Sequence, residues 1–195
     1  MADDEQQIHR GLNGVYFDRT STTHIDGREG TLQYRGYSIH DLAQQSTFEE
    51  TSYLLLNGEL PTAELLRSFD SDLRGARTLP GGVIDIIRAT ADAHPMDVLR
   101  TAVSALAAFD PEVGDNSPEA TLRKGNRLTA QAPTLVTAHH HIRNGRDPID
   151  PDPNLAHAAN FLHMLHGKTP SDDAASLMDT DFILHADHGS NASAF

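Results

Sequence analysis

The chain has 195 residues, a hydrophobic content of 38% and a formal net charge of -13 at pH 7, so it can bury a core as one large domain or as part of a bigger one. The negative charge argues against nucleic acid or an anionic membrane as a partner. The absence of cysteine excludes disulfides, thiolate metal sites and a cysteine nucleophile, and it fits a reducing cytoplasm.

The N-terminal residues give no sign of a targeting segment. Residues 1–5 are acidic where a signal peptide is basic, and no apolar run approaches the roughly 18–20 residues that span a bilayer. We therefore predict a soluble, cytoplasmic protein. Residues 1–10 are polar, and we expect them to be flexible.

A short β-like pattern follows. Within residues 12–37, three runs are rich in β-forming side chains, at 15–17, 20–25 and 32–34. Gly27 and Gly30 supply a turn between the last two runs, so this stretch predicts one or two small hairpins. Residues 39–43 then predict a short helix.

From residue 46 onward the pattern is helical, and capping residues mark the helix ends. Capping-box candidates at residues 46–50 open a helix that ends at Asn57-Gly58, and the next begins at Pro61-Thr62. Further helices are predicted over residues 83–91, 94–109 and 118–143, over 155–166 with Asn154 as the cap, and after the cap Ser171.

Pro133 lies inside the predicted helix 118–143 and predicts a kink there. Taken together, these elements predict a mainly α, multi-helical fold with a small N-terminal β-hairpin region.

The most chemically dense stretch is residues 185–188, at the C-terminal end of the last predicted helix. It places the imidazoles of His185 and His188 and the carboxylate of Asp187 just before a chain reversal at Gly189. A histidine in this position can donate a hydrogen bond to a substrate carbonyl or carboxylate. Two other interpretations stay open: a His-x-x-His metal site, which lacks a third ligand and a zincin signature, and a pair of structural histidines bonded to backbone carbonyls.

Other histidines and arginines form weaker candidates. Three successive histidines at 139–141 point about 100° apart on a helix and cannot converge on one ion, so we predict a solvated helix end. A polar helix face is predicted for His157, His163 and His166. Residues 94–100 could be a structural helix start or a functional one, and Arg35 could be an exposed residue beside a turn or an anion-binding group.

Residues 184–193, Leu-His-Ala-Asp-His-Gly-Ser-Asn-Ala-Ser, closely resemble the large-domain motif of the citrate synthase family in its bacterial and archaeal form. Other segments resemble the family in the same order, so that the resemblance covers residues 11–195. These segments are residues 25–27, 34–39, 48–50, 54–61, 94–96, 99–101 and 157–162.

The resemblance implies a mostly helical large domain from an enzyme that forms a homodimer or a hexamer. Such enzymes condense acetyl-CoA with oxaloacetate and water to citrate and CoA in the tricarboxylic acid cycle, with acetyl-CoA as co-substrate and without a metal or other cofactor. By this resemblance His188 would bind oxaloacetate and polarise its ketone. His185 and Asn191 would shape or support the same pocket.

The remaining catalytic groups of the family are a second histidine, an aspartate base and the arginines that hold oxaloacetate. They lie further along the chain in family members, so they are expected beyond Phe195. Residues 11–195 would then be the N-terminal part of the large domain, without the small domain and the closing helices. The apolar ending at residues 191–195 suggests a cut chain, and we predict that residues 1–195 alone do not catalyse the reaction.

Three other functions stay open. Residues 94–98 also resemble the 2-methylcitrate synthase branch, which uses propionyl-CoA, and discrimination of one methylene is worth only about 1–3 kcal/mol. The chain could instead be a truncated, non-catalytic homologue that acts as a dimerisation or regulatory partner of a full-length enzyme. A generic helical scaffold for an unrelated ligand is the third interpretation.

Overall fold

The computed structural model describes residues 14–15 and 19–189 of the chain. Residues 1–10, expected to be flexible, and residues 16–17 of the first β-like run lie outside this part. The described part contains eight α-helices, one 3-10 helix and a three-stranded sheet, and none of these helices combines the length and apolarity that crossing a membrane requires. The mainly α fold class predicted from the sequence is confirmed.

The N-terminal strands form a small antiparallel sheet. Strand β1 (Thr23–Asp26) pairs with β2 (Thr31–Tyr34), and β2 pairs with β3 (Tyr37–Ser38). The Asp26 carboxylate closes the turn between β1 and β2 by accepting hydrogen bonds from the backbone N–H groups of Arg28 and Glu29, at 2.9 and 3.2 Å. The predicted hairpin is confirmed.

The helices start largely where capping residues predict. In chain order they are α1 (Ile39–Gln45), α2 (Phe48–Asn57), α3 (Ala63–Gly75), α4 (Gly81–Ala89), α5 (Pro95–Leu106), the 3-10 helix η2 (Ala107–Phe109), α6 (Pro118–Arg143), α7 (His157–His166) and α8 (Asp172–Leu184). First-turn N–H groups are capped by the side chains of Thr47, Thr62, His94, Ser117 and Ser171. Helix α2 ends as predicted, with Gly58 left-handed at φ 93°.

Helix α4 begins earlier than the sequence predicts. The sequence predicts a helix only from residue 83, but Gly81 and Gly82 are already helical. The ring of Phe109 packs on Gly82, where a Cβ atom would lie 2.6 Å from the ring Cζ atom. Gly82 therefore lets α4 approach η2, which replaces the regular helix expected up to residue 109.

Helix α7 begins at His157 rather than at Leu155, and Asn154 is not its cap. The N–H of Asn154 bonds the Asp152 carboxylate at 2.8 Å. The carbonyl oxygen of Leu155 accepts a hydrogen bond from Arg77 Nη1 at 2.8 Å. These contacts hold the residues before His157 in a connector, and the predicted start of this helix is wrong by two residues.

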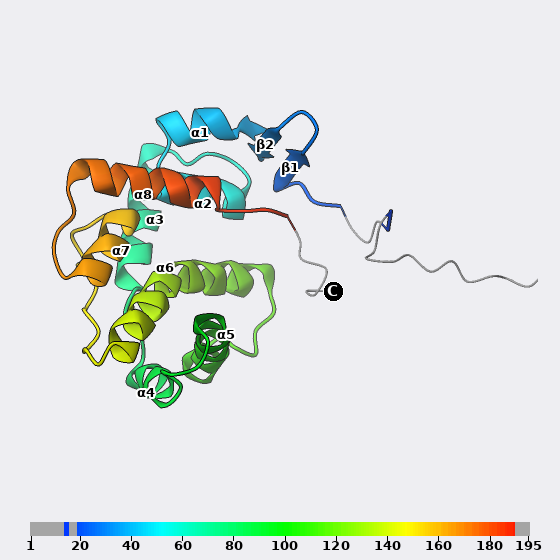
Figure 1. Cartoon of the computed structure of the whole chain (residues 1–195). Helices are drawn as coiled ribbons and strands as arrows, with labels where there is room; N and C mark the ends of the chain where they lie inside the picture. Colours follow the sequence, from blue (N-terminus) through cyan, green and yellow to red (C-terminus); the bar gives the residue numbers. More distant parts are fainter. Residues whose placement is uncertain (1–13, 16–18, 190–195) are drawn as a thin grey trace, which may run out of the picture.

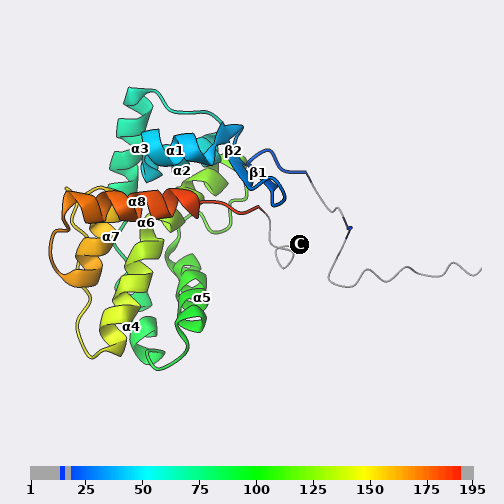
Figure 2. The same cartoon turned by 45° about the horizontal axis from the view of Figure 1, so that its top comes forward.

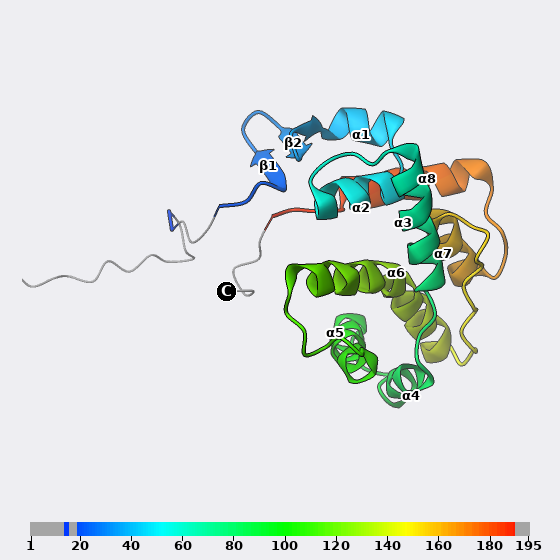
Figure 3. The same ribbon diagram turned by 180° about the vertical axis from the view of Figure 1, so that it is seen from behind.

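Helix α6 runs from Pro118 to Arg143 and changes direction partway along, as Figure 1 and Figure 3 show. Pro133 lies inside it and has no N–H to donate to the carbonyl four residues earlier. The hydroxyl of Thr137 donates to the carbonyl oxygen of Pro133 at 2.9 Å, a side-chain bond that also bends helices. This change of direction agrees with the kink predicted at Pro133.

Helix α6 is the centre of the helical packing. It contacts α3, α4, α5 and α7, with α4 and α5 on one side of it and the sheet, α1 and α8 on the other (Figure 1). One core cluster joins α4, α5 and α6 and consists of Val83, Ile87, Val98, Ala102, Leu106, Leu135 and Ala138. A second joins the sheet, α1, α2 and α8 and consists of Tyr34, Ile39, Leu42, Leu54 and Ile183.

The histidine run near the end of α6 is not a solvated helix end. His139 and His141 are 6% and 3% exposed. The Nε2 atom of His139 lies 3.1 Å from the carbonyl oxygen of Ala91, and that of His141 lies 2.8 Å from the carbonyl oxygen of Met164. The segment after α4 and helix α7 cover this end of α6, so carbonyls replace water as partners. The prediction was wrong for these two residues.

Helix α8 brings the C-terminal segment to the sheet. It packs against α1, α2 and α7, and Figure 2 shows its C-terminal end directed toward β1 and β2. Ile183, in its last turn, is buried in the cluster around Tyr34. This packing and the contacts with the three helices together set where the residues after α8 begin.

Candidate active site

The segment after α8 is fixed to the sheet by the hydroxyl of Tyr34. This hydroxyl donates a hydrogen bond to the carbonyl oxygen of Leu184 at 3.2 Å and accepts one from the N–H of Asp187 at 3.3 Å. The side chain of Tyr34 is fully buried. One phenol therefore satisfies the carbonyl of the last residue of α8 and a backbone N–H three residues further along the chain.

Thr23 makes a second contact with this segment. It is the cross-strand partner of Tyr34, so the two side chains share one face of the hairpin, and its hydroxyl donates to a carboxylate oxygen of Asp187. Burial raises the pKa of Tyr34, and the negative charge of Asp187 adds to this increase. The phenol is therefore protonated at neutral pH and can donate to the carbonyl of Leu184.

His185 occupies the C-cap of α8 and bonds back to the helix. Its Nδ1 atom lies 2.8 Å from the carbonyl oxygen of Asp181, and because a carbonyl only accepts, the ring proton sits on Nδ1 in this contact. The Asp181 carboxylate lies 3.5 Å from the same nitrogen, and the His185 side chain is 75% exposed. This is the carbonyl-bonded arrangement considered as the structural interpretation of the sequence.

His188 follows the anchored residues and is exposed. Gly189, the next residue, is left-handed at φ 78°, a conformation that glycine adopts readily and that is common in turns. The structure therefore places His185, Asp187 and His188 in one segment, whereas Asn191 lies outside the described residues. Within the described ranges, no three His, Asp or Glu side chains are grouped so that they could hold a metal ion.

Two surface hollows flank residues 185–187. The smaller, of about 240 Å³, is lined by Asp187 together with Thr22, Ser52, Leu55 and Leu56. The larger, of about 390 Å³, is lined by His185 together with Ala132, Pro133, Val136, His157, Phe161 and Phe182. Both hollows share Phe48, Thr129 and Ala186. Concave, mostly apolar surfaces with a few polar groups are typical of small-molecule sites.

The larger hollow has an aromatic wall that includes a buried histidine. The ring of Phe48 lies 4.8 Å from that of His157 and 5.3 Å from that of Phe182. Burial lowers the pKa of His157 to about 4, and the positive charge of Arg77 adds to the decrease. The imidazole is therefore neutral at pH 7, and its Nδ1 atom has no hydrogen-bond partner among the described residues.

The polar helix face predicted over His157, His163 and His166 is wrong for the first of these residues, which is 3% exposed. His157 lies four residues before Phe161 and seven before Met164, and Met164 is fully buried. That helical spacing is the signal in the sequence that places His157 on the inner face. His166 is exposed, as predicted.

Arg35 forms hydrogen bonds with other residues of the fold. Its Nη1 atom donates to the hydroxyl of Ser21 at 2.7 Å, and its Nη2 atom donates to the carbonyl oxygen of Leu55 at 2.8 Å. These bonds engage both terminal nitrogens of the guanidinium group and argue against the anion-binding interpretation, although its buried Nε atom has no hydrogen-bond partner among the described residues. The Nδ1 atom of His94 accepts from the N–H of Met96 at 3.3 Å, which is the structural interpretation of that helix start.

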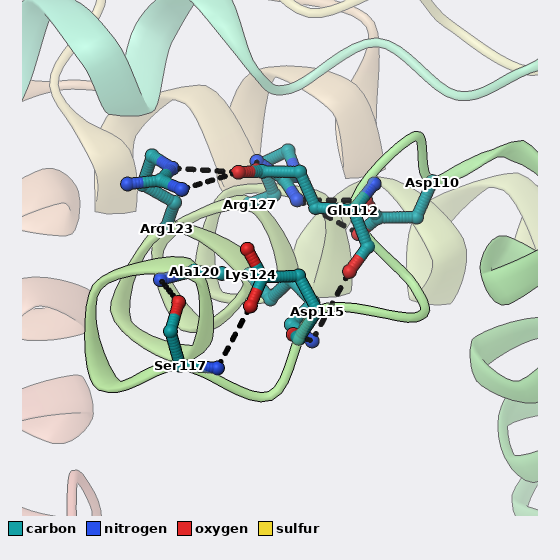
Figure 4. A network of polar contacts seen from close by, with 8 residues as sticks. All are labelled: Asp110, Glu112, Asp115, Ser117, Ala120, Arg123, Lys124 and Arg127. Atoms are coloured by element: carbon teal, nitrogen blue, oxygen red, sulfur yellow. Dashed lines mark hydrogen bonds and ion pairs between the residues drawn. The ribbon is translucent and has the colours of Figure 1, made fainter.

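A charged cluster elsewhere fastens the loop between η2 and α6 (Figure 4). Arg127 binds the carboxylates of Asp110 and Glu112 at 2.8 Å, and Arg123 also binds Glu112. These hydrogen bonds lower the pKa of both carboxyl groups. Lys124 donates to the carbonyl oxygen of Glu112 at 3.3 Å. Since each of these cations is bonded to the loop, the cluster holds the loop rather than offering charge to an anionic ligand.

Comparison with known proteins identifies similar chains. A family model described as citrate synthase, C-terminal domain, matches residues 11–195. The citrate synthases of Deinococcus radiodurans and Haloferax volcanii are each 44% identical to this chain, over 96% and 97% of its length and 50% and 51% of theirs. The 2-methylcitrate synthase 1 of Corynebacterium glutamicum is 42% identical, over 98% of this chain and 52% of its own.

Solved structures of citrate synthases have a similar fold. The crystal structure of citrate synthase from Pyrobaculum aerophilum superposes with a TM-score of 0.91 at 38% identity, over 96% of this chain and 49% of that one. Citrate synthase from Thermotoga maritima superposes with a TM-score of 0.82 at 31% identity. The chain thus spans about half the length of the relatives that it matches.

Proposed function

Because this chain belongs to the citrate synthase family, we propose that it takes part in the condensation of acetyl-CoA with oxaloacetate and water to citrate and CoA. The observation that supports this role most directly is the segment 184–188. It carries the family-like motif, it is anchored by Tyr34 at the end of α8, and it leaves His188 exposed next to residues that line two hollows.

In the proposed role, His188 donates a hydrogen bond to the ketone oxygen of oxaloacetate. The methyl carbon of acetyl-CoA loses a proton and forms a bond with the ketone carbon, and the electron pair of the C=O bond moves to the oxygen, which then takes up a proton and becomes the hydroxyl of citrate. A positioned imidazole stabilises the negative charge that develops there. Hydrolysis of the thioester by water then releases CoA. His185 and Asn191 would shape the pocket around oxaloacetate.

The groups that abstract the proton and bind the carboxylates are proposed to lie outside this chain. By the family resemblance we expect a second histidine, an aspartate base and arginines beyond Phe195, and the coverage of about half of each relative supports this. Residues 11–195 would be the N-terminal part of the large domain. The complete enzyme would be a cytoplasmic homodimer or hexamer that needs no metal or prosthetic group.

The test is an assay of purified residues 1–195 for release of CoA from acetyl-CoA and oxaloacetate, beside calorimetric titration of oxaloacetate into an enzyme that joins this sequence to the complementary half. We expect no CoA release above that of a His188→Ala variant, and oxaloacetate binding that weakens about tenfold in that variant. His24→Ala, at an exposed position on β1, is the matched control. Equal affinity in His188→Ala and the unmodified chain would contradict the binding role. CoA release above the His188→Ala level would contradict the location of the catalytic groups.

2-Methylcitrate synthesis is the second candidate function. Proteins of that name from Corynebacterium glutamicum and Mycobacterium tuberculosis are 42% and 39% identical to this chain, nearly as similar as the citrate synthases. The kcat/KM values for acetyl-CoA and propionyl-CoA decide between the two, measured on an enzyme that joins this sequence to the complementary half. A pocket that discriminates one methylene changes the ratio by about 10–200-fold.

A further inference from the structure

The hairpin and the end of α8 meet at one place, although 153 residues separate Tyr34 and Asp187 in the chain. Thr23 and Tyr34 are paired across the hairpin, and both hydroxyls reach Asp187. The hydroxyl of Thr23 bonds the carboxylate and that of Tyr34 bonds the backbone N–H. The Tyr34 hydroxyl also bonds the carbonyl oxygen of Leu184. Three hydrogen bonds thus join two hydroxyls of the sheet to residues 184–187.

These hydrogen bonds to the sheet begin where the backbone hydrogen bonds of α8 end. Helix-type backbone bonds continue as far as Ala186, whose N–H lies 3.3 Å from the carbonyl oxygen of Ile183. The next N–H, that of Asp187, bonds the hydroxyl of Tyr34 instead. The position of His188, the residue that follows, therefore depends on how firmly the sheet holds Asp187.

We propose that Thr23 and Tyr34 are positioning residues for His188, which hold residues 184–187 in the conformation that binds oxaloacetate. This inference rests on the proposed function. Neither hydroxyl touches the substrate in this role, because each acts through Asp187. Removal of either hydroxyl should loosen the segment while the side-chain packing of the sheet is kept.

The test compares variants by two measurements: the hydrogen-exchange rate of the Asp187 amide by NMR in residues 1–195, and oxaloacetate affinity by calorimetry in the enzyme that joins this sequence to the complementary half. Tyr34→Phe and Thr23→Val each remove one hydroxyl with little change in shape, and Thr23→Ser keeps the hydroxyl. Ile39→Val is the matched control, because Ile39 is 7% exposed in the same core cluster and its substitution lowers overall stability without touching these hydrogen bonds.

For Tyr34→Phe, which removes both hydrogen bonds of this hydroxyl, we expect exchange at Asp187 about tenfold faster and oxaloacetate binding about tenfold weaker. Thr23→Val should also raise the exchange rate and weaken oxaloacetate binding, whereas Thr23→Ser should keep both values close to those of the unmodified protein. Ile39→Val should change neither value by more than about twofold. If Tyr34→Phe matches Ile39→Val in both measurements, the positioning role is overturned.

The two proposals fail in different ways. If the unmodified joined enzyme binds oxaloacetate and its Tyr34→Phe variant binds it equally well, the positioning role of Tyr34 is overturned while the proposed function stands. If the exchange rates change as expected and the unmodified joined enzyme binds no oxaloacetate, the anchoring of Asp187 is upheld and the proposed function fails.

Discussion

Glu49 accepts a hydrogen bond from the backbone N–H of His157 at 2.7 Å, although 108 residues separate them in the chain. Glu49 is 5% exposed on α2. Its carboxylate lies at the N-terminus of α7, where the N-cap residue Ala156 offers no side-chain acceptor. Negative charge at a helix N-terminus is favoured by the helix dipole and by the unpaired N–H groups. Helix α2 therefore supplies the cap that α7 lacks.

We expect Glu49→Ala to lower the free energy of unfolding by about 2–3 kcal/mol, because it leaves a buried N–H without a partner. Glu49→Gln keeps an acceptor oxygen and should recover at least half of the loss. Urea unfolding followed by circular dichroism measures both. Glu59→Ala, exposed between α2 and α3, is the control and should stay within about 0.5 kcal/mol. A loss no larger than the control's would contradict the capping role of Glu49.

His157 makes the stability of the chain depend on pH. Burial lowers its pKa from 6.5 to about 4. Between these values the unfolded chain binds a proton that the folded chain does not, so the free energy of unfolding falls as the pH falls through this window. His157→Phe keeps a ring against Phe48, 4.8 Å away in the unmodified protein, and removes the titration.

The loss of stability between pH 7.5 and pH 4.5 should therefore be smaller in His157→Phe than in the unmodified chain, by about 2–3 kcal/mol. Urea unfolding at the two pH values measures this difference, and each protein at pH 7.5 is its own reference. Identical pH dependence in the two proteins would mean that the folded chain binds the proton as readily as the unfolded chain, which burial of a neutral imidazole does not allow.

The histidines show which parts of the fold could be predicted from sequence. Helix starts depend on neighbouring residues, so Thr47 and Ser117 identify helices that begin at the next position. The burial of His139 and His141 depends on segments that are distant in the sequence. These segments pack over this end of α6 and place the carbonyl oxygens of Ala91 and Met164 beside the two rings. The run of three histidines does not by itself predict that those segments will cover it.

The candidate site also has one part that could be predicted from the sequence and one part that could not. The motif that contains His185 and His188 is local, and its residue types alone mark it as a candidate. The hydroxyl that fixes the motif belongs to Tyr34, which is 153 residues before Asp187 and appears in the sequence as an ordinary apolar strand position. Its role depends on a hydrogen bond between distant elements, which periodicity does not encode.

Asp179 has the opposite effect on pH dependence. Its carboxylate accepts a hydrogen bond from the N–H of Phe48 at 3.2 Å. Burial raises its pKa from 3.8 to about 6, the bond from Phe48 opposes this increase, and the charge of Glu49 adds to it. Between pH 4 and pH 6 the folded chain binds the proton more tightly than the unfolded chain. This group therefore makes the free energy of unfolding fall as the pH rises.

Asp179→Asn removes this titration and keeps an oxygen that can accept from Phe48. We expect the variant to be more stable than the unmodified chain at pH 7.5 by about 1 kcal/mol, a value reduced for the solvent screening of a half-exposed group, and to show no gain at pH 4. Urea unfolding at both pH values measures this, with Asp85→Asn on the exposed side of α4 as the control for the change in net charge. Lower stability at pH 7.5 would mean that the ionised bond to Phe48 outweighs the cost of burial.

Arg127 contributes to stability through two carboxylates at once. It binds Asp110 and Glu112 at 2.8 Å, and its side chain is 30% exposed. Arg100 makes a single pair with Asp97, and these two side chains are 79% and 56% exposed. Ion pairs in a network contribute more than isolated surface pairs, so we expect Arg127→Met to lower the thermal midpoint by about 2–4 °C at low salt and Arg100→Met by less than about 1 °C.

Salt and pH separate the ionic contribution of Arg127 from the packing of its aliphatic stem. The difference in midpoint between the unmodified chain and Arg127→Met should shrink in 1 M salt, where the Debye length falls to about 3 Å. It should also shrink as the pH falls below 3.8, because the hydrogen bond from Arg127 lowers the pKa of Asp110 below that value and protonation of the carboxylate removes the stabilisation. Thermal unfolding at two salt concentrations measures the difference. A midpoint difference that does not depend on salt would assign the effect to packing and not to the ion pairs.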